Sequence, residues 1–70
     1  MTVKELLEPF DLKTSEIDEV DLYDIEEGED YEFFSSKELQ DGLNEFGYRR
    51  VKSYFVQTYE GKRIFSICFK

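Results

Sequence analysis

Apolar residues recur with the period of a helix in two segments of this 70-residue chain. In the first segment they fall at i, i+3, i+4 and i+7, which lie on one helical face: Val3, Leu6, Leu7 and Phe10. Thr2 and Glu5 have the spacing of a capping box, in which each side chain satisfies a backbone N–H of the other residue. Pro9 cannot continue a helix, so the pattern predicts a short helix that ends near Glu8.

The second helical segment has a start and a stop signal. Ser35 and Glu38 repeat the capping-box spacing, and three apolar positions follow at i, i+4 and i+7: Leu39, Leu43 and Phe46. Gly47 stands where many helices take a left-handed residue as their cap. We therefore expect a helix from about Ser36 to Phe46, with Gly47 as its left-handed cap.

In two other segments apolar and polar residues alternate with a period of two, as in β-strands, and each segment predicts a β-hairpin. Acidic and apolar residues alternate over residues 19–25, and Gly28 lies in the turn 26–29 before a second strand, 30–34. In the C-terminal segment, Glu60-Gly61 is a two-residue turn that pairs Tyr59 with Lys62. This register sets Val56 opposite Phe65 and Tyr54 opposite Ile67 on one face; the other face then carries Val51, Phe55, Ile64 and Cys68.

Together these elements predict an α+β fold. Residues 1–70 form a single small domain of order αββαββ, in which two short helices pack on an antiparallel sheet made of two hairpins. Both faces of the C-terminal hairpin are half apolar, which is unusual for an exposed antiparallel sheet. One of these faces should pack on the helices.

Charge is distributed unevenly along the chain. The 17 acidic and 9 basic residues give a net charge of −8, but residues 1–47 carry −13 and residues 48–70 carry +5. Ten carboxylates lie between residues 16 and 32, where no basic residue occurs: Glu16, Asp18, Glu19, Asp21, Asp24, Glu26, Glu27, Glu29, Asp30 and Glu32. The function of this chain is therefore to be sought in an acidic surface.

The composition argues against the common chemistries. No histidine is present, and the single cysteine, Cys68, lies between two apolar residues as a small buried hydrophobe would. The spacing of Asp18, Asp21 and Asp24 does not match a calcium loop, and 70 residues scarcely build a concave catalytic site. We expect no enzymatic activity, no cofactor and no metal. Apolar runs of two or three residues predict no membrane segment, and the first 15 residues no signal peptide, so we expect a cytoplasmic protein.

The acidic segment approaches the charge density of a nucleic acid. Folded as a hairpin, its ten carboxylates lie about 2.8 Å apart along the axis at roughly 3.3 Å per residue. One strand of duplex DNA carries a charge about every 3.4 Å. The segment is thus a candidate nucleic-acid mimic with seven partner-binding charges, Asp18, Asp21, Asp24, Glu26, Glu27, Glu29 and Asp30, and with two aromatic anchors, Tyr23 and Tyr31.

Two stretches carry a resemblance to known proteins. Residues 1–8, Met-Thr-Val-Lys-Glu-Leu-Leu-Glu, and residues 20–28, Val-Asp-Leu-Tyr-Asp-Ile-Glu-Glu-Gly, resemble small acidic proteins encoded by phages and mobile elements of Firmicutes. In size and acidity the chain is similar to the anti-CRISPR proteins that act as DNA mimics. The resemblance implies a non-enzymatic inhibitor in the bacterial host cell. Its partner would be the basic DNA-binding groove of a bacterial nuclease, such as a CRISPR effector nuclease.

Three alternatives stay open from the sequence. The carboxylates can be a solvated surface without a partner. The chain can be a homo-oligomeric accessory protein, a homodimer through the 48–70 hairpin and its Tyr54 and Phe55. Arg49, Arg50 and Lys52 interleave with aromatic residues as in surfaces that bind nucleic acid, but the −13 of residues 1–47 opposes direct binding of nucleic acid.

Overall fold

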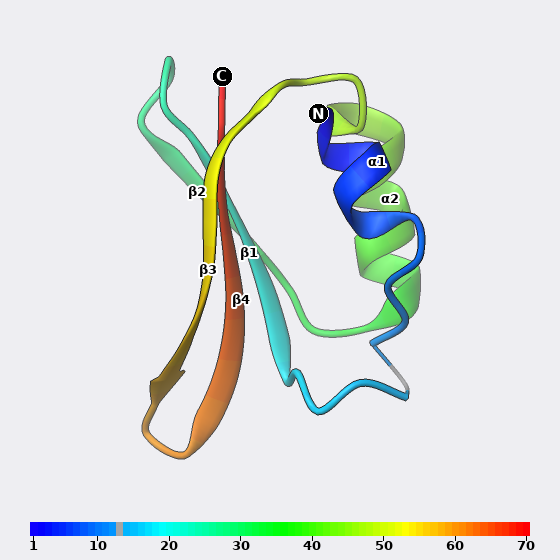
Figure 1. Ribbon diagram of the computed structural model, residues 1–70, viewed down its shortest axis with the longest axis vertical. Coiled ribbons are helices and arrows are strands. Elements are labelled where there is room, and N and C mark those ends of the chain that lie inside the picture. Colours follow the sequence, from blue (N-terminus) through cyan, green and yellow to red (C-terminus); the bar gives the residue numbers. More distant parts are fainter. Residues whose placement is uncertain (13) are drawn as a thin grey trace.

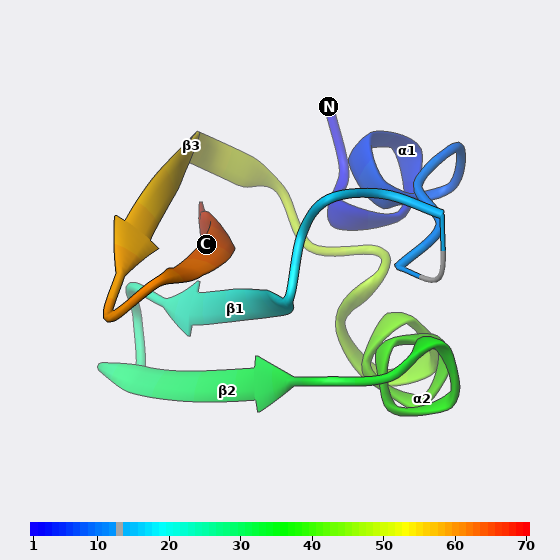
Figure 2. The same cartoon turned by 90° about the horizontal axis from the view of Figure 1, so that it is seen from below.

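Helices and hairpins follow one another along the chain in the computed structural model, which describes residues 1–12 and 14–70 (Figure 1). The elements are α1 (Val3–Leu7), β1 (Glu19–Asp24), β2 (Glu29–Phe33), α2 (Ser36–Phe46), β3 (Val51–Tyr59) and β4 (Lys62–Phe69). The α+β class is confirmed. The four strands form one sheet, and both helices lie on the same side of it (Figure 2).

The helix starts agree with the capping patterns. At α1 the capping box is formed, because the Thr2 N–H donates to Glu5 Oε1 at 2.9 Å and the Glu5 N–H donates to Thr2 Oγ1 at 3.2 Å. At α2 the Glu38 N–H donates to Ser35 Oγ at 3.2 Å. These local bonds fix both N-termini at the predicted residues.

The predicted left-handed cap at Gly47 is wrong. Gly47 has φ −57° and ψ −28°, in the right-handed helical region. Its neighbours explain why a glycine stands here: a Cβ would collide with the Leu43 carbonyl oxygen and lie 3.3 Å from Lys4 Cβ. The Gly47 carbonyl also accepts the Lys4 N–H at 2.9 Å. Gly47 therefore allows the end of α2 to approach the start of α1 closely.

The sheet is mixed, so the prediction of an antiparallel sheet is wrong. The strand order is β2-β1-β4-β3, and the two hairpins β1–β2 and β3–β4 are antiparallel. They join through β1 and β4, which run parallel with Glu19 opposite Ile64 and Asp24 opposite Phe69. A parallel pair requires a long crossover connection, and here β2, α2 and β3 supply it. No local turn reveals such a pair in the sequence.

The register of β3 and β4 agrees with the prediction except at Val51. Val56 lies opposite Phe65 and Tyr54 opposite Ile67. A register shift between Val51 and Ser53 inserts one extra residue, which inverts the alternation and moves Val51 opposite Phe69. Val51 therefore lies on the helix side of the sheet and packs against the core, away from the face of Phe55.

The core lies between the helices and one face of the sheet. Eight buried apolar side chains form it: Val3, Leu7, Val20, Leu22, Leu39, Phe46, Ile67 and Phe69. The tip of the β3–β4 hairpin projects beyond the helices, so β3 is largely exposed (Figure 1). The second face of the sheet has neither helix against it (Figure 2). Among the described residues, none of the helices has the length and apolar character needed to cross a membrane.

Candidate protein-binding surface

Four carboxylates lie side by side on the sheet face that the helices leave uncovered. Glu19 and Asp21 project from β1 on the side opposite Val20 and Leu22, since alternate residues of a strand point to opposite faces; Glu19 is only 7% exposed and Asp21 is half-buried. On β2, Glu32 lies opposite Asp21, and Asp30 lies two residues before Glu32 on the same face. The four strand carboxylates, together with Glu26 and Glu27 of the β1–β2 turn, are called the acidic face below.

The uncovered sheet face is hollowed around Asp21. One depression of about 390 Å³ is lined by Asp21 and Glu32 from the acidic hairpin and by Lys62 from β4. A second depression of about 250 Å³ is lined by Asp21, Asp30 and Phe55. Asp21 lines both depressions, so it lies where the acidic and the apolar parts of this face meet.

Asp21 resists ionisation. Burial, then a hydrogen bond with Glu19, then the charges of Glu19, Glu32 and Asp30 raise the pKa of Asp21 from 3.8 to about 7. Its Oδ1 atom is buried and accepts no hydrogen bond from the described residues. Two ionised carboxylates cannot bond each other, so the hydrogen bond with Glu19 favours the protonated form of Asp21. Asp21 therefore keeps its proton part of the time near neutral pH.

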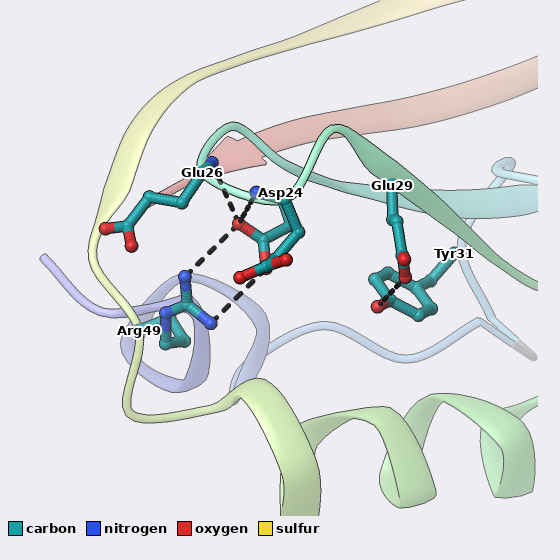
Figure 3. A network of polar contacts seen from close by, with 6 residues as sticks. Asp24, Glu26, Glu29, Tyr31 and Arg49 are labelled. Carbon is teal, nitrogen blue, oxygen red and sulfur yellow. Dashed lines mark hydrogen bonds and ion pairs between the residues drawn. The ribbon is translucent and has the colours of Figure 1, made fainter.

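Asp24 is buried and holds the turn that presents the acidic face. Its Oδ1 atom accepts the N–H of Glu26 at 3.0 Å and the N–H of Glu27 at 3.3 Å (Figure 3). Arg49 donates Nη2 to the same oxygen at 3.2 Å and Nη1 to Oδ2 at 3.4 Å, and its guanidinium lies 4.8 Å from the centre of the Phe69 ring. Only 2% of Asp24 is exposed. Asp24 is thus a structural residue, and its assignment as a surface mimic charge is corrected.

Glu29 and Tyr31 lie on the other side of β2 from the acidic face. The Tyr31 hydroxyl donates to Glu29 Oε2 at 2.7 Å (Figure 3). The Tyr31 ring packs against Phe46 with the centroids 4.5 Å apart. That hydrogen bond is the main reason that the pKa of Tyr31 is raised to about 12. Because both face the helices, neither belongs to the same surface as Asp21 and Asp30.

Asp18 lies at the end of β1 that is distant from the turn. Its carboxylate accepts the Arg63 N–H at 2.9 Å, while the neighbouring Glu16 pairs with the Arg63 guanidinium at 2.6 Å. Asp18 therefore holds the start of β4 against β1. Of the nine predicted residues, the structure brings Asp21, Tyr23 and Asp30 together on the uncovered face and places Glu26 and Glu27 at the turn beside it.

Glu19 and Glu32 complete the acidic face but were not among the predicted partner-binding residues. The alternation over residues 19–22 contains the signal for Glu19, because it places Glu19 on the face of Asp21. Glu32 could be found only from the hairpin register, which sets it opposite Asp21. A β1–β2 turn one residue longer or shorter would have placed Glu32 on the other face of the sheet.

The acidic and basic parts of the sequence form opposite sides of the sheet. The acidic hairpin supplies β2 and β1, and the basic C-terminal hairpin supplies β4 and β3. In the part of the chain that the structure describes, the ion pairs are Arg49 with Asp24 and Arg63 with Glu16. Neither pair neutralises a carboxylate of the acidic face.

Neither a metal-binding cluster nor a match to a known protein accompanies this surface in the described part of the chain. Over residues 1–12 and 14–70, no three carboxylate or thiol side chains gather in a way that could hold a metal ion. Comparison with protein-family models, with curated proteins and with solved structures finds no match for this chain.

Proposed function

We propose that the acidic face binds a basic protein and blocks its nucleic-acid-binding groove by charge mimicry. The observation that carries the proposal is the gathering of Asp21, Asp30 and Glu32, beside the largely buried Glu19, on an uncovered sheet face without a lysine or arginine in an ion pair with them among the described residues. A groove lined with lysine and arginine would supply the missing counter-charges. The partner class is a bacterial nucleic-acid-binding protein, a CRISPR effector nuclease included.

The spacing of these carboxylates supports the proposal. Residues two apart on one strand are separated by about 6.7 Å, and neighbouring strands by about 4.8 Å. The four sheet carboxylates occupy three levels along β1 and β2. They therefore span about 13 Å, a mean separation of about 4.5 Å along the strands, which is of the same order as the charge spacing of a nucleic-acid strand. One strand of duplex DNA has a charge about every 3.4 Å along its axis. Tyr23, which is 37% exposed on the same face, supplies an aromatic contact.

A protonated Asp21 makes such binding depend on pH. A basic groove stabilises the ionised carboxylate, so it lowers the pKa of Asp21 and a proton leaves on binding. By linkage, the affinity rises as the pH increases through about 7 and levels off once the free protein is ionised there. Replacement of Asp21 by asparagine removes this dependence while the other carboxylates stay in place.

The test is a charge reversal with a matched control. The test variant carries Glu26→Lys, Glu27→Lys and Asp30→Lys, which are exposed residues of the acidic face. The control variant carries Glu38→Lys, Asp41→Lys and Glu45→Lys, which change the net charge equally on the exposed side of α2. Each tagged protein is used to capture proteins from a nuclease-treated bacterial lysate, and the retained protein is then challenged with a short DNA duplex.

The proposal predicts a specific pattern of capture. The wild type and the α2 control retain the same nucleic-acid-binding protein, added duplex DNA or high salt releases it, and the acidic-face variant does not retain it. Capture that survives in the acidic-face variant, or that DNA does not compete, contradicts the proposal. Loss of capture in both variants would show that net charge alone is responsible, and it also contradicts the proposal.

A further inference from the structure

β3 has a free edge along most of its length. β4 pairs with one side of β3 from Ser53 to Tyr59. On the other side the N-terminal residues reach only the start of the strand, where the Val51 N–H donates to the Met1 carbonyl at 2.9 Å and Thr2 bridges to Arg50. From Ser53 to Tyr59 this edge has no strand beside it in the described part of the chain.

The hairpin turn determines which backbone groups the free edge offers. Glu60 and Gly61 both have positive φ, 51° and 79°, as a two-residue hairpin turn requires. The turn bonds Tyr59 to Lys62, and in an antiparallel ladder every second pair is bonded in the same way. The residues between those pairs therefore direct their N–H and C=O groups away from β4: Tyr54, Val56 and Thr58.

Both faces of this edge strand expose apolar side chains. Tyr54, Phe55 and Val56 are each 51% exposed, although Phe55 points to the opposite face from the other two. Natural sheets protect long apolar edge strands with charge, proline, bulges or another strand, because such edges pair readily with another chain. On β3 the bulge and Lys52 lie only at the N-terminal end, so Ser53–Tyr59 is left open to pairing.

We propose that β3 pairs antiparallel with β3 of a second copy, about a two-fold axis at Val56, so that the two sheets become continuous. In this register Val56 lies opposite Val56 of the second copy, Tyr54 opposite Thr58, and Phe55 opposite Gln57. The three residues with outward backbone groups then bond one another. The two Phe55 rings become diagonal neighbours on one face, within reach of each other. The whole exposed edge from Ser53 to Tyr59 pairs with the second copy, and the start of β3, which already bonds Met1, takes no part in the pairing.

The charges fit this arrangement. Antiparallel pairing places Lys52 of each copy beside the Glu60 turn of the other, so opposite charges meet at both ends. The acidic hairpins stay at the two distant edges of the joined sheet, because β2 is the outermost strand on that side. Pairing through β2 would instead bring Glu29, Asp30 and Glu32 against their own copies, which like-charge repulsion opposes. A second copy on β3 is therefore the occupant that the charge pattern favours.

The first test is the mass of the protein in solution. Light scattering on the size-exclusion peak should give twice the 8.4 kDa of one chain at high concentration. Val56→Lys sets two like charges against each other at the axis and should weaken the dimer at least about tenfold. The control, Phe34→Lys, changes a side chain with the same 51% exposure outside β3 and should leave the dimer intact. A wild type that stays monomeric up to about 1 mM overturns the proposal, as does equal weakening by both variants.

The second test is the register. In a Cys68→Ser background, Val56→Cys places two cysteines directly opposite each other, within the Cα separation that a disulfide accepts. Tyr54→Cys would lie about 13 Å from its own copy, four residues along the strands, and should not crosslink. Covalent dimers on mild oxidation are thus expected for Val56→Cys only. Equal or faster crosslinking of Tyr54→Cys overturns the two-fold axis at Val56. Both tests leave the acidic face unchanged, so they are independent of the proposed function.

Discussion

Replacement of Asp24 by alanine should destabilise the fold far more than replacement of any exposed carboxylate. The substitution leaves the Arg49 guanidinium without its partner and the N–H groups of Glu26 and Glu27 without their acceptor. Removal of one member of a buried ion pair costs about 3–5 kcal/mol, because the other charge stays buried. The Arg49 side chain is 19% exposed and can recover part of its hydration, so we expect a loss of about 2–4 kcal/mol.

This loss is large for so small a domain. At about 0.05–0.15 kcal/mol per residue, a domain of this length has a free energy of unfolding of only about 4–10 kcal/mol. Asp24→Ala would remove from about a fifth to nearly all of it. Asp24→Asn keeps an oxygen for the Glu26 and Glu27 N–H groups but loses the charge that Arg49 faces, so its cost should be about 1–2 kcal/mol.

The assay is urea unfolding followed by far-ultraviolet circular dichroism and by tyrosine fluorescence, since the chain has no tryptophan. Glu27→Ala serves as the control because its exposed side chain lies in the same turn. The expected order of stability is wild type and Glu27→Ala, then Asp24→Asn, then Asp24→Ala, with an unchanged slope against urea. If Asp24→Ala costs less than about 1 kcal/mol or no more than Glu27→Ala, the buried pair does not hold the turn.

Three further changes have expected outcomes. Asp21→Asn should raise the melting temperature at pH 8 and leave it unchanged near pH 3. The pKa of Asp21 is raised from 3.8 to about 7 in the folded protein, so the wild type is most stable while Asp21 is protonated. As the pH rises through about 7, the wild type loses about 1–2 kcal/mol of its free energy of unfolding, after allowance for partial exposure of Asp21. Gly47→Ala should cost about 1–3 kcal/mol in urea unfolding, since a Cβ meets the Leu43 carbonyl oxygen. Thr2→Ala should cost about 1 kcal/mol by the same measurement, because it removes the cap of α1.

Each of these expectations has its own contradicting result. A melting temperature of Asp21→Asn that follows the wild type at every pH would show that Asp21 ionises normally; Asp41→Asn, an exposed carboxylate of α2, is the control. A Gly47→Ala variant as stable as the wild type would mean that the last turn of α2 can shift Gly47 away from the Leu43 carbonyl at little cost. No loss of stability in Thr2→Ala would show that the bond from the Glu5 N–H to Thr2 contributes nothing.

Features that depend on nearby residues could be predicted from the sequence. The partners in the capping box of α1 are three residues apart, and the turn at Glu60-Gly61 sets the register of β3 and β4 from Tyr59 back to Ser53. The β1–β2 hairpin is also local, and its register places Asp21 and Asp30, two of the predicted partner-binding residues, on one face of the sheet.

Features that depend on distant residues could not be predicted. Arg49 and Asp24 are 25 residues apart, and no pattern in the sequence marks one as the partner of the other. The alternation over β1 shows that Asp21 and Asp24 face opposite sides, but it does not show which side the helices cover. The parallel pairing of β1 with β4 depends on the crossover through β2, α2 and β3, which is itself a tertiary feature.

The place of β4 in the sheet has a consequence for the order of folding. β4 is the last strand in the chain, yet it lies between β1 and β3 in the sheet. During synthesis the acidic hairpin leaves the ribosome first, but a lone two-stranded hairpin is at best marginally stable in water. It obtains its inner neighbour only when residues 62–69 have been made. We therefore expect the sheet to form only once residues 62–69 have been made and in a single cooperative step, at a rate limited by closure of the long loop between β1 and β4.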